Sequence, residues 1–248
     1  MVISLPFKPV SAEAQVENFP ELSLEGLAHK VDALVEHSPE EAIAYMVEIK
    51  MRLTNSMSEE YRNIYCENLF RLGLTHMSAY NQFSDAKWLL GAVPYWTEFT
   101  SDFLSDSRHS LAMLNLGDCY YGAEYWSDAM DVYLHTIEVY SMQIDSEDLL
   151  GILKRINHAS ISCAREIETN KVLWKFLAKK YSYSIRLFCL EALFDDSLKN
   201  NNISELLKLV GIINADPLFR YNIGLNIRLL HTGDKFEDEE RYLEASLL

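Results

Sequence analysis

Chain-breaking residues are scarce in this 248-residue sequence, which contains only 9 glycines and 6 prolines. No proline occurs between Pro39 and Pro94, or between Pro94 and Pro217. An all-β fold needs many tight turns, and glycine and proline are among the residues that supply them. The composition therefore predicts an all-α fold built from long helices.

The sequence also lacks an excess of basic residues and any long apolar run. It has 22 Lys and Arg residues against 37 Asp and Glu residues, which gives a net charge of −15. A nucleic-acid binder needs a basic face, and so does a protein that docks on anionic membranes. No apolar run approaches the ~20 residues that span a bilayer, and the start of the chain does not resemble a secretory signal. We expect no nucleic-acid partner, no membrane insertion and a cytoplasmic location.

Sequence signatures of catalysis and metal binding are absent as well. There is no glycine-rich phosphate loop, no Gly-x-Ser-x-Gly elbow, no acidic calcium loop and no closely spaced histidine pair. The four cysteines are far apart and have apolar neighbours, which predicts buried free thiols rather than a disulfide framework or a zinc site: Cys66, Cys119, Cys163 and Cys189. We therefore predict no catalytic residue, no metal and no cofactor, and hence no enzyme within these residues.

Apolar residues at helical spacing begin after a proline-containing start. Residues 1–22 hold three prolines and show no helical period, so we expect an extended N-terminal arm. From Leu24 onward, amphipathic stretches alternate with short polar turns. One turn contains Ser38, which can cap a helix, followed by Pro39 at a favoured first helical position. The pattern predicts one helical repeat domain over residues 23–248.

The most informative stretch reads LGDCYYGAEYWSDAM. Leu116, Gly117 and Tyr120 fall on one stripe of a helix, because residues three and four apart are neighbours. Ala129 and Tyr133 fall on one stripe of a second helix, after a turn that contains glycine, serine and aspartate. A small residue on each helix predicts a close helix–helix contact, with aromatic rings filling the space around it.

This unit resembles the tetratricopeptide repeat, a helix–turn–helix motif with a period of about 34 residues. Leu116, Gly117, Tyr120, Ala129 and Tyr133 match the motif's Leu-Gly pair, its later aromatic, and the small residue and aromatic of its second helix. The resemblance implies a TPR-like α-solenoid of antiparallel helix pairs.

The match has departures and a weaker copy. Met113 replaces the usual tryptophan, and Ser141 replaces the closing proline. An earlier unit contains Leu72-Gly73, and its FSDA sequence, ending at Ala86, parallels the WSDA sequence of the best unit. Because Gly73 and Gly117 lie 44 positions apart, the loops or helices must be longer than in the family.

In tetratricopeptide proteins the first helices line a groove that holds a peptide or a partner helix. Mapped onto this sequence, the resemblance gives a partner groove of Glu67, Phe70, Leu74, Met77, Leu111, Leu114, Asp118 and Tyr121. These residues do not form the clamp of lysines and asparagines that grips a carboxylate in many family members. The expected partner is therefore a protein or peptide with an apolar or basic segment. Alternatively, these residues pack against the array's own helices.

The C-terminal stretch FEDEERYLEASLL leads to two further expectations. Its apolar residues Tyr242, Leu243 and Leu247 form a candidate seam for self-association as a homodimer, unless they pack on the preceding helix. The same stretch resembles the linker before a bacterial GGDEF (diguanylate cyclase) domain. That resemblance implies a regulatory or sensory region of a bacterial signalling protein, with a further domain after Leu248. The alternative is a free-standing cytosolic adaptor or co-chaperone-like scaffold.

Overall fold

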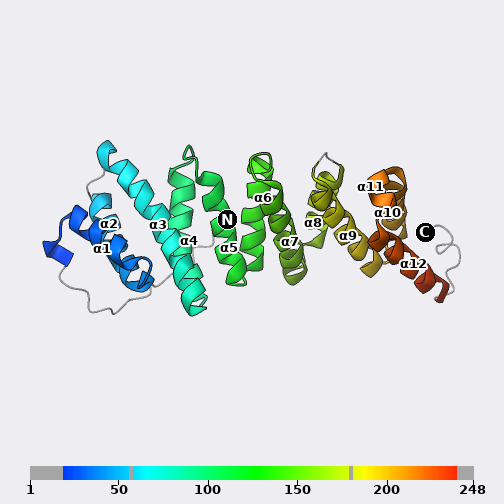
Figure 1. Cartoon of the computed structure of the whole chain (residues 1–248), viewed down its shortest axis with the longest axis horizontal. Coiled ribbons are helices and arrows are strands. Elements are labelled where there is room, and N and C mark those ends of the chain that lie inside the picture. Colours follow the sequence, from blue (N-terminus) through cyan, green and yellow to red (C-terminus); the bar gives the residue numbers. More distant parts are fainter. Residues whose placement is uncertain (1–18, 56–57, 179–180, 239–248) are drawn as a thin grey trace. The chain divides into compact units, whose positions relative to one another are not determined.

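The computed structural model describes residues 19–55, 58–178 and 181–238 (Figure 1). Over these residues it contains twelve α-helices, one 3-10 helix and no β-strand. The predicted all-α fold is therefore confirmed. Contacts divide the chain into two compact units, Met1–Ser141 and Met142–Leu248.

In the first unit, each helix packs on the next one along the chain. Short turns reverse the direction between successive helices, so the helices form antiparallel pairs (Figure 1). This is the packing of a TPR-like α-solenoid, as the sequence predicted. The six helices are α1 (Leu24–Leu34), α2 (Pro39–Asn55), α3 (Glu59–Phe83), α4 (Lys87–Asp102), α5 (His109–Gly122) and α6 (Trp126–Tyr140).

The predicted glycine contact lies between α5 and α6. Gly117 faces the ring of Tyr133, and a Cβ atom at Gly117 would lie only 2.5 Å from Tyr133 Cε1. Ala129 and Tyr133 are fully buried, and the Tyr133 hydroxyl donates a hydrogen bond to Asp118. The absence of a side chain at Gly117 is therefore what lets α6 approach α5 at this point.

The corresponding contact of the preceding pair uses different residues from those expected. A Cβ atom at Gly73 would overlap the indole of Trp96 on α4. Ala86, the expected equivalent of Ala129, is instead the exposed residue that precedes α4. The physical reason is helix length, because α3 continues to Phe83 and so places the turn further from Gly73 than the α5–α6 turn lies from Gly117.

The residues just before α1 are folded against α2. Phe19–Glu21 form a 3-10 helix, and the Arg52 guanidinium donates hydrogen bonds to the carbonyl oxygens of Phe19 and Leu22. The Phe19 ring packs edge-on against Tyr45, with 5.2 Å between centroids. The end of the predicted extended arm is thus a compact turn, while residues 1–18 lie outside the described residues.

The second unit is also helical, and its helices pack mainly on their neighbours along the chain. Arg186 links two of them, because its guanidinium forms an ion pair of 2.6 Å with Asp216 and stacks over the Phe219 ring at 4.9 Å. The helices are α7 (Ser146–Cys163), α8 (Glu166–Ala178), α9 (Tyr183–Lys199), α10 (Ile203–Ala215), α11 (Pro217–Arg220) and α12 (Ile223–Asp238).

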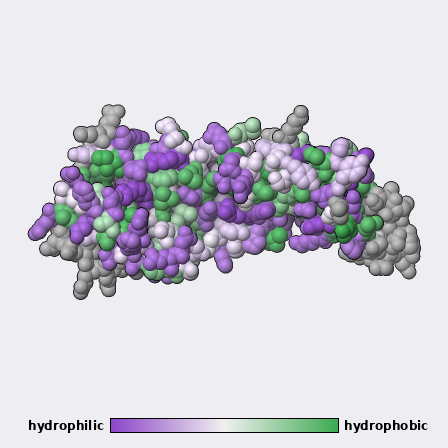
Figure 2. Space-filling model, in the orientation of Figure 1, coloured by the Kyte–Doolittle hydropathy of each residue, from purple (hydrophilic) through white to green (hydrophobic). Residues whose placement is uncertain are grey.

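The surface of the described residues is mixed in character. Figure 2 shows hydrophobic and hydrophilic side chains interspersed over the visible face of the first unit. Among the described helices, none combines the length and the apolar character that a membrane span requires.

Candidate functional site

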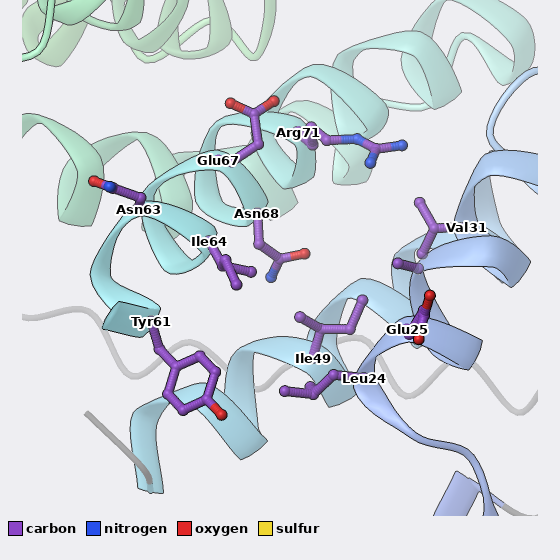
Figure 3. A pocket seen from close by; sticks show the side chains of 11 residues that line it. Leu24, Glu25, Val31, Ile49, Tyr61, Asn63, Ile64, Glu67, Asn68 and Arg71 are labelled. Atoms are coloured by element: carbon purple, nitrogen blue, oxygen red, sulfur yellow. The ribbon is translucent and has the colours of Figure 1, made fainter. Parts of the chain in front are cut away.

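A groove of about 620 Å³ lies in the first unit, between α1 and α3 (Figure 3). Both of these helices pack on α2, and α2 contributes Ile49 to the floor. The α1 wall consists of Leu24, Glu25, Ala28 and Val31. The α3 wall consists of Tyr61, Asn63, Ile64, Glu67, Asn68 and Arg71. The volume is within the usual range of protein binding pockets, about 300–1,000 Å³.

The α3 wall is a stripe of the helix surface. Tyr61, Ile64, Asn68 and Arg71 are spaced three, four and three residues apart, which places them on one face. Asn68 is the buried residue of these four, and its side-chain amide donates a hydrogen bond of 2.9 Å to the Met46 carbonyl oxygen. This bond fixes the wall to α2.

Apolar side chains dominate the part of the groove that a ligand would touch. Ile64 projects from α3 with 49% of its surface exposed, whereas Ile49 on the floor and Val31 on the α1 wall are buried. Tyr61 and Leu24 are half-buried at the sides. Covering such side chains with another apolar group removes surface from water, which favours binding at roughly 25 cal/mol per Å².

Charged residues lie along the rim, and most are paired. Arg71 forms an ion pair of 2.7 Å with Asp32 of α1, which links the two walls. Glu67 forms an ion pair of 2.6 Å with Arg108, just before α5. Glu25 forms no hydrogen bond or ion pair with any other described residue. The rim therefore has a small surplus of negative charge, on the unpaired carboxylate of Glu25.

The four groove positions predicted on α3 have different surroundings. Glu67 lies on the rim of the groove, and Leu74 is exposed one turn beyond Arg71 on the same stripe. Met77 is half-buried and packs against the core. Phe70 is a core residue, because its ring packs on Trp96 and Phe99 and beneath the Arg108 guanidinium. Only Glu67 of these four lines the groove.

The four positions predicted on α5 do not line it. Leu111 is exposed and Leu114 is half-buried. Asp118 accepts the hydrogen bond from the Tyr133 hydroxyl, and the Tyr121 ring packs edge-on against Trp126 at 5.2 Å. Asp118 and Tyr121 therefore take part in packing within their own helix pair, whereas Leu111 is open to solvent. A partner surface on α5 stays a prediction.

The residues that the sequence did not single out are those of α1 and the start of α3. A signal for the start of α3 was present, since Ile64 is an apolar residue on the polar stripe that also carries Glu67 and Arg71. The candidate self-association residues Tyr242, Leu243 and Leu247 lie outside the described residues.

The lining of the groove is mainly apolar and carries few titratable side chains. Of the eleven residues that line it, only Glu25, Glu67, Tyr61 and Arg71 have titratable side chains. Within the described ranges, no three His, Cys, Asp or Glu side chains gather as a metal site would require.

The histidines with clear surroundings pack between helices. His109 Nε2 lies 3.0 Å from the Thr100 carbonyl oxygen, and the Tyr140 hydroxyl donates to Nδ1 at 2.8 Å. His76 is buried in the space left open by Gly91, and its burial lowers its pKa to about 4. His76 is therefore neutral at physiological pH.

All four cysteines are free thiols, and three of them are buried. Burial raises the pKa of Cys66 to about 11, and of Cys119 and Cys189 to about 12. Cys163 is half-buried, and its pKa is also raised by burial. None of these thiols is activated as a nucleophile.

Comparison with known proteins gives only structural likenesses. No protein-family model matches the chain, and no curated protein matches it. One similar solved structure is the crystal structure of the nearly identical TPR-like repeats of a putative kinesin light chain from Podospora anserina. It has 12% sequence identity and a TM-score of 0.44, over 77% of this chain and 93% of that chain. A second crystal structure, of a single-residue variant of the same repeats, gives the same values. The TPR-like fold is assigned from the helix packing described above.

Proposed function

We propose that this chain is a non-catalytic protein-interaction module, and that the groove between α1 and α3 binds a peptide segment of a partner protein. The ligand carries apolar side chains that cover Ile64 and Leu24. It also carries a basic residue that faces Glu25 or Glu67 on the rim. The module acts by holding this segment, and it carries out no bond-making step.

The observation that supports this proposal is the exposure of an apolar side chain inside a groove that already exists. Ile64 is half exposed although the walls around it are held by the Arg71–Asp32 ion pair and the Asn68 hydrogen bond. A preformed wall lowers the entropy lost on binding, because fewer side chains need to be ordered. A basic ligand also suits the unpaired carboxylate of Glu25 better than an acidic one.

Selection from a displayed library of random 12-residue peptides tests the proposal. Peptides are selected on the full chain and counter-selected on the Ile64→Glu variant, which adds a charge at the centre of the groove. We expect enriched peptides to combine two or three large apolar residues with a lysine or arginine. Their affinity for the Ile64→Glu variant is expected to be at least ~10-fold lower, which corresponds to ~1.4 kcal/mol.

Ile227 supplies a matched control for this experiment. It lies on α12 of the second unit and is 48% exposed, so Ile227→Glu is as mild a change for folding as Ile64→Glu. Selected peptides should bind this variant as they bind the unchanged chain. Failure to enrich any peptide, or equal binding to both variants, would contradict the proposed function.

The wider setting of the module is proposed from the sequence. We place it in the cytoplasm, as the regulatory or sensory region of a bacterial signalling protein, with a free-standing adaptor or co-chaperone-like scaffold as the alternative. The four free cysteines support the location, because thiols stay reduced in the cytosol. The GGDEF linker resemblance and the homodimer seam depend on residues 239–248, outside the described part, so both stay predictions.

A further inference from the structure

The chain reaches the first helix at the edge of the groove. Leu24, the first residue of α1, lines the groove, and Leu22 lies two residues before it. Arg52 of α2 holds the carbonyl oxygens of both Phe19 and Leu22. These bonds fix the point at which the preceding residues must start, within a few residues of the groove wall.

The preceding sequence has the chemistry that the groove favours. Residues 2–10 read VISLPFKPV, with five apolar side chains, one lysine and no acidic residue. Such a composition is notable in a chain of net charge −15. Lys8 is complementary to the unpaired rim carboxylate of Glu25, and the apolar side chains suit the surface around Ile64.

The connecting residues are long enough for this segment to reach the groove. Residues 11–18 can span up to about 26–29 Å at 3.3–3.6 Å per residue. The α3 wall from Tyr61 to Arg71 is only about 15 Å long at 1.5 Å per residue of helix. The connection therefore allows the segment to lie along the wall in either direction.

We propose that residues 2–10 of the same chain bind in the groove between α1 and α3 and compete there with an external peptide. This proposal rests on the proposed function, because it assigns an internal ligand to the same site. A tethered segment has an effective concentration of about 1 mM. If the free segment binds with a Kd of about 0.1 mM, the tethered copy weakens an external peptide about tenfold.

A labelled peptide of sequence VISLPFKPV tests the proposal by fluorescence anisotropy. Its affinity is compared for the full chain and for a chain that lacks residues 2–10. We expect about tenfold tighter binding to the shortened chain, since its groove is open. In the shortened chain Ile64→Glu should abolish this binding and Ile227→Glu should not. Equal affinity for the full and shortened chains would overturn the proposal, as would binding that Ile64→Glu leaves unchanged.

Photo-crosslinking locates the segment directly in the full chain. Phe7 is replaced by the photoreactive p-benzoylphenylalanine, and the chain is crosslinked at high dilution, digested and analysed by mass spectrometry. We expect crosslinks to residues 61–71 of α3, and Ile64→Glu should remove them. Crosslinks only elsewhere, or none, would overturn the internal ligand.

Failure of the internal ligand can be separated from failure of the module itself. A library-selected peptide that binds the full and shortened chains equally, but loses affinity with Ile64→Glu, refutes the competition and leaves the proposed function intact. If neither the selected peptides nor VISLPFKPV binds in an Ile64-dependent way, both proposals are wrong.

Discussion

Replacing Gly117 by alanine sets two effects on stability against each other, because the added methyl group clashes with its neighbour whereas alanine has the higher helix propensity. A Cβ atom at this position would lie 2.5 Å from Tyr133 Cε1 and 2.7 Å from Cδ1. The ring has little room to move, because Tyr133 is fully buried and its hydroxyl is bonded to Asp118. The added methyl group must therefore push α6 away from α5 or force the ring from its position.

Two opposing effects set the size of the change. Alanine in a helix interior is favoured over glycine by about 0.8–1 kcal/mol, whereas overpacking a filled core costs about 1–3 kcal/mol. Gly26 on α1 provides the control in the same unit, since a Cβ there would meet Leu22 Cδ2 at an ordinary 3.5 Å. We expect Gly117→Ala to be less stable than Gly26→Ala by about 1–3 kcal/mol.

Thermal unfolding followed by circular dichroism measures this difference. At about 4 °C per kcal/mol for a unit of this size, Gly117→Ala should melt about 4–12 °C below Gly26→Ala. The substitution Tyr133→Leu removes the ring that clashes with the added methyl group. Tyr133→Leu should therefore lower the free energy of unfolding less in the Gly117→Ala variant than in the unchanged chain. The close-contact reasoning is refuted if Gly117→Ala melts as high as Gly26→Ala.

Three further outcomes follow from the first unit and the thiols. The pKa of His76 is about 4 in the folded chain, against an ordinary 6.5. As the pH falls, the unfolded chain therefore takes up the His76 proton at a higher pH than the folded chain, and the free energy of unfolding decreases between pH 6.5 and pH 4. The loss amounts to about 3 kcal/mol at most, and His76→Phe should reduce it in urea unfolding at pH 7 and pH 4.5. With a thiol reagent at pH 8, only Cys163 should react before unfolding, and prompt reaction of a second thiol would contradict the burial of the other three. Arg52→Leu removes the hydrogen bonds to the Phe19 and Leu22 carbonyl oxygens and the ion pair with Glu48, and should lower the free energy of unfolding by about 2–4 kcal/mol. An unchanged midpoint would show that the turn before α1 is held by other contacts.

Much of the fold could be predicted because local sequence determines it. The few chain breakers and the 3.6-residue period are enough to indicate helices, and the small–large pairing of Gly117 with Tyr133 identifies a contact between neighbours in the chain. The partner of Gly73 could not be found in this way. It depends on where α3 ends, and no glycine or proline marks that end at Phe83.

The candidate site was harder to predict, because a groove forms where two helices stay apart and the sequence does not show which helices these are. Glu67 was identified, but Phe70 was assigned to the same surface although it points into the aromatic core with Trp96. The two side chains are three residues apart, and only the position of α4 decides which of them is covered. The α1 wall was missed, since a wall formed by Leu24 and Val31 looks in the sequence like any other amphipathic helix.

The glycine contacts also restrict how the two helices of a pair can be aligned. If α6 slid along α5 by one helical turn, the Tyr133 ring would face Met113 or Tyr121 instead of Gly117. A similar slide of α4 along α3 would bring Trp96 against Leu69 or Met77. All four of these side chains are too large to leave space for a ring, so each slipped alignment clashes. An apolar helix stripe is nearly uniform along its length and permits many alignments of two helices. A glycine that faces an aromatic ring permits only the alignment in which the ring lies against the glycine.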